Sequence, residues 1–125
     1  SVAVNRRLGL ALLLGIHPTV AWAVDLDSDD YWRLPTAGCD LMWVEAVDGG
    51  FVATGAGCLL RLRLGRDGGG LAYEVSVGLR SDVGTLGVAA VLPDGTLAAG
   101  SADGRLHLLD LDSLPPEPVL SGRLE

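Results

Sequence analysis

Short apolar runs, each about the length of one β-strand, alternate with turns rich in glycine and aspartate along the chain. Three of the runs, residues 12–15, 52–55 and 97–100, end in a glycine, and these glycines are 40 and 45 residues apart. Strict alternation of leucine and arginine over residues 60–64 is typical of a strand with one buried face. A repeat of 40 to 45 residues is expected of four-stranded propeller blades.

The pattern predicts an all-β fold, namely three consecutive four-stranded antiparallel blades of a β-propeller within residues 1–125. Blade 1 covers about residues 1–35, blade 2 about 41–79 and blade 3 about 86–124. The expected strands are residues 2–5, 8–15, 19–27 and 31–34, then 41–47, 51–55, 59–64 and 71–77, then 86–92, 96–100, 105–112 and 119–124. Proline and glycine in the turns at 93–95 and 102–104 support the chain reversals in blade 3.

An acidic segment, Asp-Leu-Asp-Ser, occurs at residues 25–28 and again at 110–113, each time ten residues after the marker glycine. Leu106 and Leu108, however, fall one position later than the alternating apolar residues of the other two copies. Either the turn at 102–104 is one residue longer, or the acidic segments align without a gap. Both alignments stay open at the level of sequence.

The third copy resembles a WD repeat over residues 86–112. Its residues 100–111, Gly-Ser-Ala-Asp-Gly-Arg-Leu-His-Leu-Leu-Asp-Leu, are similar to the end of that repeat. Asp110 occupies the family's strand-end aspartate position, Asp103 the turn aspartate position, and Leu109 replaces the tryptophan. The second copy has Cys58 in place of the turn aspartate, and the glycine-histidine pair before the first strand is missing from both connections, so the family's side-chain hydrogen-bond network is incomplete.

This resemblance implies a non-catalytic platform for protein assembly. Closed propellers have about four to eight blades, so three blades imply part of a larger ring. The remaining blades are expected from the same longer chain or from other subunits. A register that starts at a first strand with Ser1 and ends after a fourth strand favours a piece of a longer protein.

Composition narrows the range of functions further. A net charge of −7 argues against direct nucleic-acid binding, which depends on clustered cations. The longest apolar run, residues 8–16, is nine residues, and a membrane-spanning helix needs about 20, so no membrane span is predicted. Cys39 and Cys58 are expected to be buried thiols, with a disulfide considered only for a secreted chain.

Binding is expected on the rim loops of the propeller and on one outer strand, because loops on rigid sheets commonly carry function. The candidate partner-binding residues are His17, Pro18, Tyr31, Trp32, Arg33, Asp40, Asp82 and Asp103. Acidic turns favour a protein partner with a basic surface.

No catalytic residues, cofactor or metal are predicted. The acidic run at 25–30 lacks the sixth-position glycine and twelfth-position glutamate of a calcium loop.

Two functional interpretations follow. The first is an intracellular, non-enzymatic protein–protein interaction scaffold within a larger protein or complex. The second treats residues 1–23 as a signal peptide, because Arg6-Arg7, the apolar run and Ala21-Trp22-Ala23 imitate its three regions. The mature protein would then be a secreted small all-β enzyme or sugar-binding domain. The alignment of this segment with the two later copies favours the scaffold.

Overall fold

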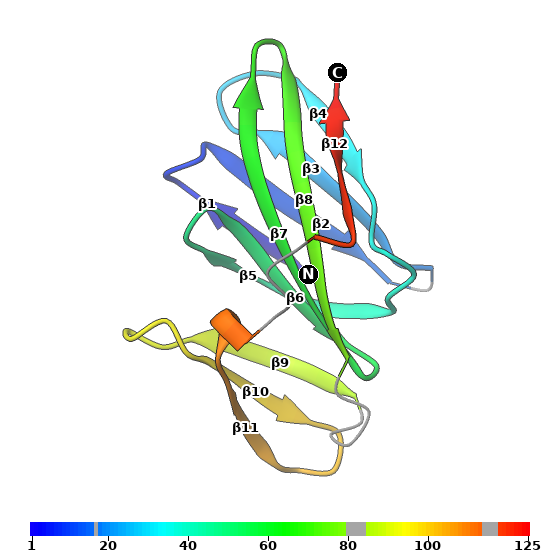
Figure 1. The fold of residues 1–125 in the computed structure, drawn as a ribbon, viewed down its shortest axis with the longest axis vertical. Helices are drawn as coiled ribbons and strands as arrows, with labels where there is room; N and C mark the ends of the chain where they lie inside the picture. The colour runs from blue at the N-terminus through cyan, green and yellow to red at the C-terminus, as the bar shows by residue number, and fades with distance from the viewer. Residues whose placement is uncertain (17, 80–84, 114–117) are drawn as a thin grey trace.

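The computed structural model describes residues 1–16, 18–79, 85–113 and 118–125, and within these ranges the chain forms three antiparallel sheets (Figure 1). The elements of the described residues are twelve β-strands and one short 3-10 helix. The all-β prediction is therefore confirmed, with sheets of four, five and three strands.

The first sheet has the strand order expected from residues 1–35. Its strands follow one another as neighbours, β1 (Val2–Asn5), β2 (Leu10–Gly15), β3 (Val20–Asp25) and β4 (Tyr31–Leu34). Leu10, Leu12 and Leu14 alternate along β2 and are at most 4% exposed, since they all point to the same side of the sheet.

The middle sheet contains β5 (Leu41–Val47), β6 (Gly50–Gly55), β7 (Cys58–Asp67) and β8 (Gly70–Leu79) in the predicted order. A fifth strand, β12 (Leu120–Leu124), pairs antiparallel with the outer edge of β8. Arg123 of β12 also forms an ion pair with Asp67 at 2.8 Å. The middle sheet is therefore built from two distant parts of the chain.

The last sheet consists of β9 (Leu86–Val91), β10 (Leu97–Ser101) and β11 (Leu106–Leu109), followed by the 3-10 helix η1 (Leu111–Ser113). The prediction that residues 119–124 form its fourth strand is wrong, because these residues pair with β8. The physical reason lies in the two edges available. β8 has ten residues and β11 only four, so β8 offers the longer hydrogen-bonding edge.

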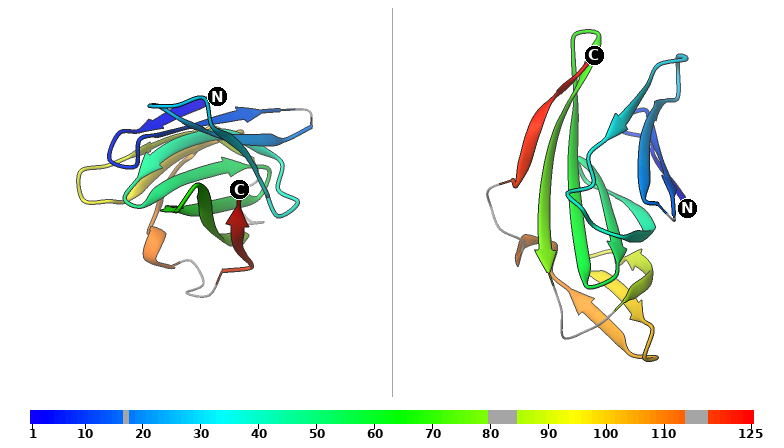
Figure 2. Two further views of the ribbon diagram at one scale, coloured as in Figure 1. Left: turned by 90° about the horizontal axis from the view of Figure 1, so that it is seen from above. Right: turned by 90° about the vertical axis from the view of Figure 1, so that its right-hand side faces the viewer.

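The first and last sheets pack on opposite faces of the middle sheet (Figures 1 and 2). Phe51 and Ala53 of β6 join the core with the first sheet, and Val52 between them joins the core with the last sheet. Each sheet thus has a rear face, toward the sheet that precedes it in the chain, and a forward face, toward the sheet that follows.

Strand pairing shows how the copies correspond. Ala53 and Gly55 pair with β5 across a register shift, and Ala99 and Ser101 pair with β9 across a shift of the same kind. Such a shift marks a β-bulge, with one extra residue on the first strand. In the structure Gly55 therefore corresponds to Ser101 and not to the marker glycine Gly100.

The acidic segments form the same turn in the first and last sheets. The backbone N–H of Asp27 donates to Asp25 Oδ1 at 2.8 Å, and that of Asp112 donates to Asp110 Oδ1 at 2.9 Å. The structure therefore favours the alignment in which these segments coincide. The consequence is that Leu106 points to the forward face of the last sheet, where it is 72% exposed.

Polar contacts connect the sheets as well. Buried Asn5 donates from Nδ2 to the carbonyl oxygens of Val47 and Gly50, both at 2.9 Å, and so ties the first sheet to the middle one. Trp43 Nε1 donates to the Ala89 carbonyl at 2.9 Å and ties the middle sheet to the last. Both contacts satisfy polar groups that are partly or fully removed from water.

A disulfide joins Cys39 and Cys58, whose Cα atoms are 6.2 Å apart. The expectation of two free thiols is therefore wrong, although both cysteines are buried as expected. The bridge links the connection between β4 and β5 to the start of β7. The spacing of two isolated cysteines in the sequence could not show that these segments meet.

Candidate functional site

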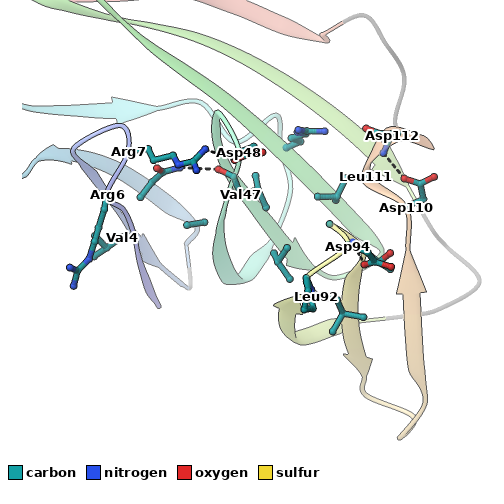
Figure 3. A pocket seen from close by; sticks show the side chains of 17 residues that line it. Val4, Arg6, Arg7, Val47, Asp48, Leu92, Asp94, Asp110, Leu111 and Asp112 are labelled. Carbon is teal, nitrogen blue, oxygen red and sulfur yellow. Dashed lines mark hydrogen bonds and ion pairs between the residues drawn. The ribbon is translucent and has the colours of Figure 1, made fainter.

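A cleft of about 650 Å³ opens at the edge of the stack where the first turn of each sheet lies (Figure 3). Its walls come from the turns β1–β2, β5–β6 and β9–β10, with Arg61 of β7 and the start of η1. All three sheets therefore contribute to one surface. A volume of this size lies within the range common for binding pockets.

The side of the cleft formed by the first and middle sheets carries arginines. Asn5 fixes the β1–β2 turn, because its Oδ1 also accepts the backbone N–H of Leu8 at 3.2 Å. Arg6 and Arg7 follow in that turn and are exposed. Arg7 lies 3.7 Å from Asp48, but both side chains are at least 90% exposed, so the pair contributes little to stability.

The side formed by the last sheet is acidic, as Figure 3 shows for Asp94, Asp110 and Asp112. Asp94 Oδ1 accepts the backbone N–H of Thr96 at 3.0 Å, and this hydrogen bond lowers the pKa of the Asp94 carboxyl group. The carboxylate is therefore held ionised and fixed in the β9–β10 turn. The cleft thus has separate cationic and anionic ends.

Arg61 lines the cleft between these ends. Its side chain is half-buried, and within the described residues its Nε atom is buried without a hydrogen-bond partner. An unsatisfied guanidinium N–H is costly when no water or ligand reaches it.

The rim residues predicted from the sequence that the structure describes lie at the opposite edge of the stack as exposed groups. Pro18, Asp40 and Asp103 are exposed, whereas His17 and Asp82 lie outside the described residues. Backbone hydrogen bonds tie this rim together, from the Ala56 N–H to the Asp40 carbonyl and from the Ala102 N–H to the Thr85 carbonyl. A hollow beside the disulfide, lined mainly by apolar groups, also lies on this side.

The predicted outer-strand group is divided by the alternation of β4. Tyr31 is 66% exposed and Arg33 is also exposed, but Trp32 is 5% exposed and packs in the core between the first and middle sheets. Trp32 is therefore corrected from a partner-binding residue to a core residue. The Arg66 guanidinium lies 5.5 Å from the centre of its ring.

Asp103 takes part in a local network rather than standing alone. The Ser101 hydroxyl donates to the Asp103 carboxylate, and His107 Nε2 lies 3.1 Å from the same hydroxyl. The hydrogen bonds from the Ser101 hydroxyl and from the Arg105 backbone N–H lower the pKa of the Asp103 carboxyl group. In a serine nucleophile relay the acid would orient the histidine, whereas here it binds the serine.

Sequence reasoning identified the turns that form the cleft but not the cleft itself. Each first turn carries charge, as Arg6 and Arg7, Asp48 and Asp94 show. That shared feature could have indicated this rim, but it is visible only once the turns are known to lie at one edge.

The described part of the chain contains neither a metal-ligating cluster nor a long apolar helix. There, no group of three or more His, Cys, Asp or Glu side chains could hold a metal ion. A helix long and apolar enough to cross a membrane is likewise not found in residues 1–16, 18–79, 85–113 and 118–125.

Comparisons of the chain with family models, curated proteins and solved structures gave no match.

Proposed function

We propose that the chain is a non-catalytic protein–protein interaction scaffold, built as three blades of a WD-repeat-like propeller that works within a larger assembly. The observation that carries the proposal is the cleft to which all three sheets contribute a turn. A rigid stack of sheets holds these turns at fixed positions, which lowers the entropic cost of binding.

The partner segment proposed for this cleft is basic. Asp94, Asp110 and Asp112 form the acidic end, and the chain as a whole carries a net charge of −7. Complementary charge speeds association and selects against acidic partners.

The test uses a fluorescent arginine- and lysine-rich peptide, with an acidic peptide of equal length as the negative probe. Anisotropy titrations at low salt should show binding of the basic peptide only. The Asp94→Asn and Asp112→Asn changes should each weaken binding about three- to fivefold, in line with an exposed charge pair of up to about 1 kcal/mol. Asparagine at position 94 can still accept the Thr96 hydrogen bond, so the turn is kept.

Asp103→Asn is the matched control, since Asp103 is an exposed turn aspartate of the same sheet at the opposite rim. It should leave the affinity unchanged. A larger effect of Asp103→Asn than of Asp94→Asn would move the binding surface to the rim predicted from the sequence. Equal binding of the acidic peptide would contradict a basic partner.

The disulfide favours a second candidate, a secreted small all-β enzyme or sugar-binding domain, because such bridges persist mainly in oxidising compartments. The structure of residues 1–23 favours the scaffold instead. Leu12 and Ala23 are fully buried in the core, and cleavage after residue 23 would remove β1, β2 and most of β3.

Mass measurement of the protein from its native host separates the two candidates. An intact residue 1–23 segment with two free thiols supports an intracellular scaffold. A new terminus at Val24 would exclude the scaffold as proposed, and an intact segment with a disulfide would keep the scaffold and place it in an oxidising compartment.

A further inference from the structure

The two end faces of the three-sheet stack are exposed and mostly apolar. The forward face of the last sheet carries Val88, Ala90, Ala98, Leu106 and Leu108, of which Val88, Leu106 and Leu108 are 63%, 72% and 64% exposed. The rear face of the first sheet carries the apolar residues Val2, Val4, Leu13, Trp22, Val24 and Tyr31, with the exposed Arg33 beside Trp22 on the same face. Contiguous exposed apolar patches on a sheet commonly mark an interaction surface.

The forward face of the last sheet corresponds to faces that are buried elsewhere in the same chain. Ala21, Leu59 and Leu106 occupy one position of the repeat, opposite the penultimate residue of β2, β6 and β10. Ala21 is 1% exposed and Leu59 is 3% exposed, each against the sheet that follows, whereas Leu106 is 72% exposed. The last sheet therefore keeps the docking position but has no following sheet on it among the described residues.

The rear face of the first sheet shows the complementary relation. Leu13, Ala53 and Ala99 occupy one position, the third from the end of β2, β6 and β10. Ala53 and Ala99 are 1% and 0% exposed against the preceding sheet, and Leu13 is 43% exposed. This face is thus of the kind that receives a forward face.

We infer that the forward face of the last sheet docks on the rear face of the first sheet in a second copy of this chain. This rests on the proposed propeller function, which it deepens by naming the partner and the two faces. The chain already joins a forward face to a rear face twice, so the exposed pair repeats an established contact.

Two copies arranged head to tail use both exposed faces of both chains. The ring then has six sheets, which is within the four to eight blades of closed propellers, whereas three copies give nine. A heterologous contact closes into a ring when its rotation allows, and two copies satisfy this with one two-fold axis.

Sedimentation of the full chain tests the stoichiometry. The expected species has a mass of about 26 kDa, twice the 12.9 kDa of one chain. A folded monomer at all concentrations overturns the inference and leaves the end faces to other occupants, such as further sheets of a longer polypeptide. A mass that keeps rising with concentration overturns ring closure.

Two substitutions test the faces themselves. Leu106→Asp on the forward face and Leu13→Asp on the rear face should each give folded monomers, because a carboxylate buried between apolar sheets is strongly unfavourable. Leu26→Asp is the matched control, since Leu26 is a 47% exposed leucine in the β3–β4 turn, and it should remain dimeric.

Mixing the two variants distinguishes head-to-tail association from other dimers. In a mixed pair, one contact joins the intact forward face of Leu13→Asp to the intact rear face of Leu106→Asp, so dimers should reappear in part. A symmetric contact between two forward faces would leave Leu13→Asp dimeric by itself and would overturn the inference. Circular dichroism of each variant establishes that the monomers are folded.

The outcome is separable from that of the proposed function. Binding of the basic peptide by a stable monomer would reject the second copy and keep the scaffold. A dimer that fails to bind the basic peptide would reject the proposed partner and keep the assembly.

Discussion

The first and last sheets cover opposite faces of the middle sheet, but they are attached in different ways. The first sheet has four strands and is tied down by buried polar groups, with Asn5 bonded to two carbonyl oxygens and Asp25 paired with Arg66 at 2.7 Å. The last sheet has three strands and rests on a smaller apolar core, with side-chain hydrogen bonds from the Trp43 N–H at 2.9 Å and from the Thr54 hydroxyl at 3.5 Å.

This difference runs against the sequence pattern. The third copy has the clearest turns and the nearest resemblance to a WD repeat, yet it forms the smallest sheet. The first copy is the least regular, yet its four strands assemble in the predicted order. Turn residues determine where the chain reverses, whereas the number of strands in a sheet depends on which strand edges are free to pair.

The largest expected effect concerns the glycine that ends the second strand of a repeat. An alanine Cβ at Gly55 would overlap the carbonyl oxygen of Asp40, whereas at Gly100 the nearest atom is 3.9 Å away. Gly55→Ala should lower the free energy of unfolding by about 2–3 kcal/mol or more. Gly100→Ala should change it by less than about 1 kcal/mol, with a gain in stability expected.

Urea denaturation of both variants measures this difference. Gly15→Ala is a further control, because its nearest atom is 3.8 Å away. Equal losses at Gly55 and Gly100 would mean that the marker glycines are structurally equivalent and that the register assigned to the last sheet is incorrect.

The sequence predicts features that depend on neighbouring residues better than features that depend on distant segments. Alternation and turn residues predicted the sheet to which eleven of the strands belong, because these two signals depend on neighbours in the chain. The pairing of β12 with β8 depends on competition between two distant edges, and the disulfide and the cleft depend on segments that meet only in the folded stack. The position of Trp32 in the core was predictable in principle, since β4 alternates and Leu34 shares its face.

A smaller effect is expected at the strand that the last sheet lacks. An alanine Cβ at Gly70 would overlap the Leu124 carbonyl oxygen of β12, whereas Gly69 has no neighbouring atom within 4 Å. Gly70→Ala should detach β12 from β8 and cost about 1–2 kcal/mol, because the clash can be relieved by releasing the terminal strand.

Amide hydrogen exchange in β12 is the direct measurement. Protection of Gly122 and Leu124 should fall in Gly70→Ala and remain in Gly69→Ala. If β12 keeps its protection in Gly70→Ala, interactions other than the β12–β8 pairing and the Arg123–Asp67 ion pair must also hold this strand on the middle sheet.

The smallest effect is a pH dependence of the first-sheet attachment. The Arg66 guanidinium, with the Asp27 backbone N–H, lowers the pKa of Asp25 from 3.8 to about 2. Because the folded-state pKa is the lower one, the ion pair stabilises the fold above pH 4 and loses this contribution as the pH falls toward 2. The melting temperature of the wild type should therefore decline more steeply across this window than that of Asp25→Asn. Asp29→Asn changes an exposed acid in the same turn and should follow the wild-type curve. Parallel curves for all three proteins would show that the pairing of Asp25 with Arg66 does not help to hold the first sheet.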